Sequence, residues 1–175
     1  VLVHATAAVR AGRSVDTDDA LASILIETAE DGNLEPAFRA LALTLPSELD
    51  IGREIGEDVD PDAIHLARKA VFSAIANSGR ASFARLVEEL REDNGFSPDA
   101  DSAGRRALRN TALAYLAEAE KSPLPARQAY DAATNMTDMI AALRILAHQF
   151  PGSAETSAVL ADFRQRFDGE PLVLD

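Results

Sequence analysis

Apolar residues recur at intervals of three and four along most of this chain, and that spacing constrains the fold more than any other feature. In the clearest case, Phe83, Leu86, Val87 and Leu90 fall on one face of a helix, while charged residues take the other face. A short helix of this kind cannot bury its apolar face alone. We therefore expect amphipathic helices that pack against one another.

Glycine and proline divide the pattern into about ten helical segments joined by a few residues each. Asp60-Pro61 is typical of a helix start, and Asn77-Ser78-Gly79 of a helix end. No segment shows a convincing strand pattern. The expected helices cover roughly Leu2–Ala11, Asp16–Glu30, Leu34–Leu43, Ser47–Ile55, the stretch from Pro61 to the Asn77 stop, Gly104–Ala119 and Pro125–Thr134. Apolar residues mark three more, around Phe83–Leu90, Ile140–Phe150 and Val159–Phe167, and the last of these is expected to end near Gly169 and Pro171.

Two of these segments carry more specific expectations. Gly104–Ala119 is apolar nearly all round after its basic start, which predicts a central helix covered by neighbours on two sides. Ile140, Leu143, Ala147 and Phe150 mark another helix, which Pro151-Gly152 ends.

Hydrophobic residues make up 47% of the chain but aromatic residues only 5%, which favours helices in close contact through small side chains. We predict an all-α fold of paired antiparallel helices, stacked in a bowl-shaped superhelical array of the HEAT or armadillo type. One domain spans 1–175, with 1–15 as an N-terminal helix and connection and 16–175 as an array that stops before its natural end. Because the chain starts at Val1 and ends in the apolar Leu172–Asp175 segment, we expect a piece of a longer protein.

Composition excludes several classes of partner and site. A net charge of −12 repels nucleic acid and anionic lipid headgroups. The chain has no cysteine, so thiolate catalysis and thiolate metal sites are excluded, and a reducing compartment fits. No apolar run approaches the roughly 20 residues that span a bilayer. We expect a cytoplasmic protein that binds neither nucleic acid nor membrane.

The histidines His4, His65 and His148 lack the spacing of a zinc site, since no His-Glu-x-x-His pattern occurs. Each is interpreted as a surface or half-buried helix residue, and none is assigned chemistry. The run Asp99–Gly104 imitates the opening of a calcium loop, but the ligand positions at Ala103 and Asn110 are wrong. The run is interpreted instead as an acidic helix N-terminus, with Asp99, Asp101 or Ser102 capping the following helix.

Two polar features remain. Asn110 lies inside an otherwise apolar helix, where a buried amide needs partners and can fix how helices meet. The turn Asn135–Asp138 reads as a helix N-cap, with Asn135 or Thr137 accepting from a backbone amide. Both are predicted to be structural ties. Arg105, Arg106 and Arg109 are expected to pair with carboxylates, and no catalytic, cofactor-binding or metal-binding residue is assigned to this chain.

Several short motifs occur in an order that resembles the C-terminal helical domain of the bacterial aminopeptidase N family, from about Asp16 to Asp175. They are Gly104–Asn110 with Leu113 and Tyr115–Ala117, Asn135–Asp138 with Ala141–Leu143, Pro171–Asp175, Thr44–Ser47 and Asp58–Pro61. Each alone is weak, and their common order carries the resemblance.

The resemblance implies a bowl of paired helices over a thermolysin-like zinc domain, with that domain and peptide substrates as partners. The family's zinc ligands, substrate-amine segment and transition-state tyrosine belong to other domains and have no counterpart here. This chain would therefore shape and close the chamber of a zinc-dependent aminopeptidase and limit access to it, without cofactor or catalysis of its own.

Two alternatives stay open. A free-standing helical adaptor could bind a peptide or a partner helix on its concave face. An enzyme formed by the isolated chain would turn over aminoacyl-naphthylamides or bind zinc, and we expect neither. The isolated fragment is also expected to self-associate through apolar surface.

Overall fold

The computed structural model describes residues 1–17, 19–91, 95–170 and 173, and this part of the chain forms ten α-helices and no strand. The all-α prediction is thereby confirmed. The helices are α1 (Leu2–Arg10), α2 (Asp19–Glu30), α3 (Pro36–Ala42), α4 (Glu48–Ile55), α5 (Pro61–Ser78), α6 (Arg80–Glu89), α7 (Ala100–Glu120), α8 (Leu124–Ala132), α9 (Met136–Gln149) and α10 (Ala154–Arg166).

Side-chain caps explain why five of these helices begin where they do. In each case a serine, aspartate or asparagine accepts a hydrogen bond from the backbone amide three residues later, which satisfies one of the free amides of the first turn. The capping residues are Ser47 for α4, Asp60 for α5, Asp99 for α7, Asn135 for α9 and Ser153 for α10.

Helix α7 is the centre of the fold, as its nearly continuous apolar character predicted. It contacts α3, α5, α6, α8 and α9. Leu108, Ala112, Leu113 and Ala117 are almost completely buried along it. The helix begins four residues before the predicted start, because Asp99 caps it at Ala100.

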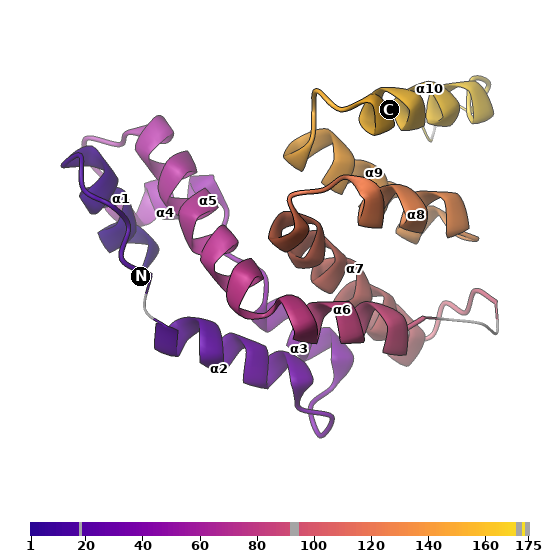
Figure 1. The fold of residues 1–175 in the computed structure, drawn as a ribbon, viewed down its shortest axis with the longest axis horizontal. Coiled ribbons are helices and arrows are strands. Elements are labelled where there is room, and N and C mark those ends of the chain that lie inside the picture. Colours follow the sequence, from indigo (N-terminus) through magenta and orange to yellow (C-terminus); the bar gives the residue numbers. More distant parts are fainter. Residues whose placement is uncertain (18, 92–94, 171–172, 174–175) are drawn as a thin grey trace.

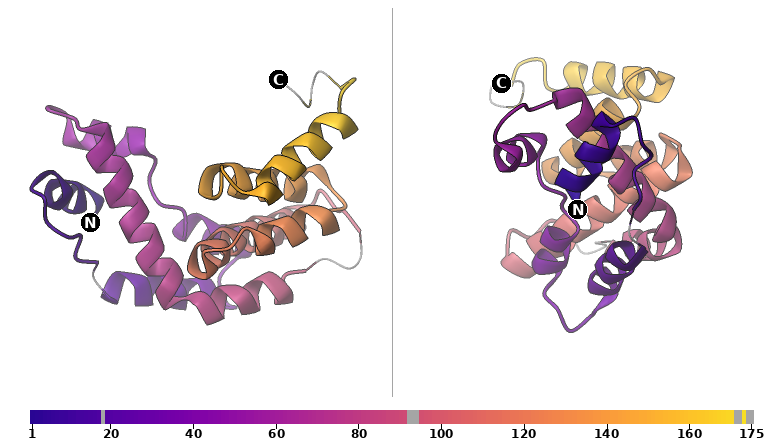
Figure 2. Two further views of the ribbon diagram at one scale, coloured as in Figure 1. Left: turned by 45° about the horizontal axis from the view of Figure 1, so that its top comes forward. Right: turned by 90° about the vertical axis from the view of Figure 1, so that its left-hand side faces the viewer.

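The array is bent. In Figures 1 and 2, α1, α4 and the first half of α5 form one arm and α8 to α10 form the other, and both arms rise on the same side of a base that includes α2, α3 and α6. Each arm is held by neighbour contacts: α1 packs on α5 and α4, while α10 packs on α9 and α8. This is the curved stacking expected of a helical-repeat array.

An aromatic cluster joins the central helix to the base. The ring of Tyr115 stacks between Phe72 of α5 and Phe83 of α6, with centroid distances of 4.3 and 4.8 Å. Its hydroxyl donates to the carbonyl oxygen of Leu43 at 2.6 Å, just after α3. Burial raises the pKa of this phenol. One side chain therefore ties α7 to three other elements.

Two buried charged groups, absent from the sequence-based predictions, make further ties. Arg39 of α3 donates from Nε to the carbonyl oxygen of Ala29 near the end of α2 at 2.7 Å, and burial lowers the pKa of its guanidinium. Glu118 of α7 accepts hydrogen bonds from Ser73 of α5 and from Lys121. Neither group belongs to a local motif, so only the packed structure shows them.

The helix marked by Ile140, Leu143, Ala147 and Phe150 is confirmed as α9, but these residues are not its most buried ones. Ile140 is 37% exposed, and Leu143 and Phe150 are only half-buried, whereas Met139, Ala142, Ile145 and Leu146 are buried. Helix α9 packs against α7, α8 and α10, so its neighbours on three sides select the buried face. An apolar stripe alone does not specify which side of a helix nearly apolar all round will be covered.

Several helix ends differ from the predicted ones by one to three residues. Helix α2 begins at Asp19 instead of Asp16, α3 spans Pro36–Ala42, and α8 spans Leu124–Ala132. Of the closing motif and apolar end predicted at 171–175, only Val173 lies within the described residues. In the described part of the chain, no helix is both long enough and apolar enough to span a membrane.

Candidate functional site

The polar residues singled out from the sequence fall into two groups. The first group consists of isolated surface residues. His4, His65 and His148 are all exposed, and His65 makes a contact of 2.8 Å between its Nδ1 and Oε1 of Glu48 on the neighbouring helix. Nothing brings the three histidines together.

Of the candidate caps in this run, Asp99 is the one that caps α7. No calcium loop forms, because α7 already begins at Ala100. Its Oδ1 accepts from the amide of Ser102 at 2.9 Å. Hydrogen bonds from Ser97 and Ser102 stabilise the ionised form and lower the pKa of this carboxyl.

The second group comes together around Asp138, in the first turn of α9. Asn110 of α7 donates from Nδ2 to Asp138 Oδ1 at 2.8 Å, and Asn135 donates from Nδ2 to Asp138 Oδ2 at 2.9 Å. Arg109 places its guanidinium 3.9 Å from the same Oδ2. We call these four residues, Arg109, Asn110, Asn135 and Asp138, the Asp138 junction.

The junction joins three helices. Arg109 Nε donates to the carbonyl oxygen of Val87 in α6 at 3.1 Å, while Asn135 caps α9 by accepting from the amide of Asp138 at 2.9 Å. The side chains of Arg109 and Asp138 are only 16% and 13% exposed, so this charge pair is screened less than a surface pair. The structural tie predicted for Asn110 and the Asn135–Asp138 turn is confirmed.

Two of the three arginines of α7 make contacts that tie the helix to its surroundings. Arg109 lies close to a carboxylate, as expected. Arg106 is buried and its guanidinium lies over the ring of Phe96, 4.6 Å from the centroid. This cation–π contact lies between α7 and the segment before it. It was not predicted, because Phe96 lies outside every periodic segment.

Two cavities flank the junction and share Arg91, Arg109, Ala129 and Ala132. One, of about 250 Å³, is lined also by Asn135 and Asp138. The other, of about 370 Å³, lies between α6, α7 and α8. Their polar side chains are guanidinium, carboxylate and amide groups together with the hydroxyl of Thr134, all of which form hydrogen bonds.

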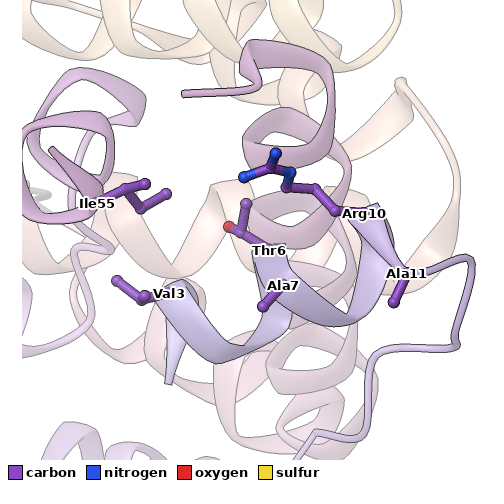
Figure 3. A pocket seen from close by; sticks show the side chains of 6 residues that line it. All are labelled: Val3, Thr6, Ala7, Arg10, Ala11 and Ile55. Carbon is purple, nitrogen blue, oxygen red and sulfur yellow. The ribbon is translucent and has the colours of Figure 1, made fainter. Parts of the chain in front are cut away.

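A separate cavity of about 390 Å³ lies beside α1 (Figure 3). Ile55 of α4 faces the side of α1 that carries Val3, Thr6 and Arg10. The Thr6 hydroxyl donates to Leu2 within its own helix, and Arg10 donates to the carbonyl oxygen of Asp58 at 3.0 Å. These polar groups are used in the fold, so the cavity offers mostly an apolar surface.

No reactive constellation is found in the part of the chain that the structure describes. It contains no group of three His, Cys, Asp or Glu residues that could hold a metal ion. Ser73 contacts both a lysine and a carboxylate: it donates to Glu118, which also accepts from Lys121. This cluster links α5 to α7 by hydrogen bonds and has a structural role. The described residues therefore do not fit a zinc site.

Comparison with known families decides the membership of the chain. A family model described as "Domain of unknown function (DUF3458_C) ARM repeats" matches residues 1–175. The chain belongs to this family of ARM-repeat domains. The predicted armadillo-type array is thus confirmed by the family as well as by the fold.

Two relatives identify the kind of protein in which this domain occurs. Aminopeptidase N of Caulobacter vibrioides is 39% identical over 159 residues, covering 90% of this chain and 18% of the relative. Aminopeptidase N of Haemophilus influenzae is 32% identical over 135 residues, covering 77% of this chain and 15% of the relative. The resemblance inferred from the ordered motifs is confirmed, and the chain spans less than one fifth of either relative.

A solved structure shares the fold. Aminopeptidase A of Legionella pneumophila, in complex with aspartic acid, superposes with a TM-score of 0.80 at 20% identity, covering 99% of this chain and 21% of the other. The fold of this chain therefore also occurs in a protein named as an aminopeptidase, at a sequence identity of only 20%.

Proposed function

We propose that this chain is the non-catalytic helical domain of a zinc-dependent aminopeptidase that removes N-terminal residues from peptides. The observation that carries the proposal is the 39% identity to an aminopeptidase N across 90% of this chain, which makes up only 18% of that relative. The remaining polypeptide of such a protein would hold the zinc and the catalytic residues. When bound there, zinc would supply Lewis-acid activation of water.

Within that protein, the domain would shape and close the chamber in which peptides are cleaved. A curved stack held by the central helix α7 is suited to this role, because a stiff wall excludes large folded chains and water while flexible peptides pass. The Asp138 junction would contribute by fixing how α6, α7 and α9 meet. A cytoplasmic location would suit a chain without cysteine.

The test compares three preparations: the full-length protein encoded by the gene that contains this sequence, the same protein without residues 1–175, and residues 1–175 alone. Aminoacyl-naphthylamides measure cleavage, and mixtures of short and long peptides measure size selection. The full-length protein should be active and lose activity on zinc chelation. Deletion should reduce the preference for short peptides, and residues 1–175 alone should show no turnover.

Two outcomes would overturn the proposal. A gene that encodes residues 1–175 with an adjacent start and stop, and no catalytic domain, would favour a free-standing adaptor. Turnover by the isolated 175 residues would instead place the catalytic residues within them.

A further inference from the structure

A second surface, far from the Asp138 junction in the fold, has the properties of a docking site. A groove of about 540 Å³ lies between α4 and the start of α5. The buried side chain of Ile64 lines it, together with Leu49 and Val59, which are 62% and 43% exposed. Exposed apolar side chains gathered around a concave surface are typical of a place where another chain binds.

Gly52 keeps this groove open. It lies inside α4, and a Cβ atom added there would lie 3.5 Å from Val59 Cγ1 and 3.8 Å from Ile64 Cδ1, which are ordinary contact distances. The missing side chain therefore leaves space against two apolar residues of the groove. Glycine weakens the interior of a helix, so this space is obtained at some cost to α4.

The surroundings of the groove are strongly acidic. Between Glu48 and Asp62 the chain carries seven carboxylates and a single guanidinium, that of Arg53, so this short segment holds half of the net charge of −12. The loop that contributes Val59 also carries Glu57 and Asp58, both exposed.

Local ion pairs compensate only part of this charge. Arg53 lies 3.4 Å from Asp50, and Arg10 of α1 lies 3.8 Å from Asp58, whose side chain is 94% exposed. Exposed pairs of this kind are weak and screened. Glu48 and Arg53, the two charged residues that line the groove, balance each other, so its net negative charge comes from the neighbouring carboxylates, among them exposed Glu57 and Asp58. The groove therefore combines an apolar floor with a negative rim formed by these neighbours.

We propose that this groove docks a partner polypeptide segment that presents one or two apolar side chains flanked by lysine or arginine. The apolar side chains fill the space beside Gly52, and the cations face the acidic rim. A second copy of this chain is a poor occupant, because it brings the same negative rim and a net charge of −12. The surface thus selects a basic, apolar peptide sequence.

The test uses the chain with a short fluorescein-labelled peptide in which a Phe-Leu pair is flanked on each side by two lysines, and fluorescence anisotropy measures binding. Binding should weaken at least fivefold when sodium chloride is raised to 0.5 M, because salt screens the rim. Replacing the lysines by glutamates, or the Phe-Leu pair by asparagines, should abolish it.

Gly52→Leu should weaken binding at least tenfold, since the new side chain occupies the groove. The matched control is Gly32→Leu, which adds the same side chain at a position with open space around it and should bind as the unchanged chain does. Circular dichroism must show an unchanged helical content in both variants. If Gly52→Leu fails to fold, Glu57→Gln combined with Asp62→Asn should reduce the salt dependence and weaken binding.

Three results would contradict the proposal. The first is no binding of the basic apolar peptide at low salt. The second is equal binding of the asparagine-containing peptide, which would indicate only nonspecific attraction of cations. The third is a dimer of the chain, seen by sedimentation, that Gly52→Leu dissociates, because a second copy would then be the occupant.

Discussion

The hydrogen bond from Asn110 to Asp138 should stabilise the whole array, and removing it is the most direct test of the Asp138 junction. Asn110→Ala deletes a 2.8 Å bond between α7 and the first turn of α9. A hydrogen bond to a charged group contributes about 1.5–3 kcal/mol. Asp138 would keep its bond from Asn135 and its proximity to Arg109, so we expect a loss of about 1–2 kcal/mol in the free energy of unfolding.

For a chain of this size, about 1 kcal/mol corresponds to roughly 2–4 °C in melting temperature, so Asn110→Ala should lower it by about 2–8 °C. Thermal unfolding followed by circular dichroism at 222 nm measures the shift, and urea unfolding gives the free energy. The control is Thr111→Ala, because the half-buried Thr111 is the next residue of the same helix and its hydroxyl donates to Ala107 of that helix. That change should stay within about 0.5 kcal/mol.

A double-mutant cycle with Asp138→Ala separates this bond from general damage to the helix. The two substitutions should be non-additive by about 1 kcal/mol, since they remove the same contact. An unchanged melting temperature in Asn110→Ala, or an equal loss in Thr111→Ala, would refute the assignment of the junction as a tie between helices.

Three further predictions concern the rest of the molecule. Gly104→Ala should lower the free energy of unfolding by about 1–3 kcal/mol in urea titrations, because the new Cβ would lie 2.9 Å from a backbone nitrogen of α3. Its counterpart Gly52→Ala places a Cβ only at ordinary contact distances and should raise the free energy of unfolding by about 0.5–1 kcal/mol. Burial raises the pKa of both tyrosines, Tyr115 and Tyr130, that of Tyr130 to about 12. Phenols of the unfolded chain ionise near pH 10, so the tyrosine contribution to stability should be fully present below that pH and be lost above it. Absorbance at 295 nm should then show phenolate appearing together with loss of helix, and phenolate formation near pH 10 in the folded chain would contradict this. The isolated chain should self-associate at micromolar concentrations through apolar surface such as that around Leu41, which is 69% exposed, and Leu41→Lys should reduce the association in sedimentation experiments.

The Asp138 junction and the proposed docking groove involve different parts of the array, so they can be tested separately. The Asp138 junction ties α6, α7 and α9, whereas the groove lies between α4 and α5. A substitution in the groove should leave the junction and its contribution to stability unchanged. Loss of peptide docking would therefore not contradict the assignment of the domain to an aminopeptidase.

Local features could be predicted from the sequence because the interactions that make them span only a few residues. Asp60, Asp99 and Asn135 each accept from the amide three positions later, so residue type and spacing limit the candidate caps to one, three and two residues, respectively, before any packing is known. The central place of α7 follows equally from one segment, since a helix that is apolar nearly all round must be covered on more than one side.

What only the tertiary structure decided depends on residues far apart in the chain. Asn110 needed a partner by its own chemistry, but the sequence does not say that this partner is Asp138, 28 positions later. The same holds for three other features, each of which depends on residues distant in the chain: the buried face of α9, the pairing of Glu118 with Ser73, and the open space beside Gly52. Periodic apolar residues show that a helix has a face to bury. Which neighbours that face contacts is decided only when the helices pack against one another.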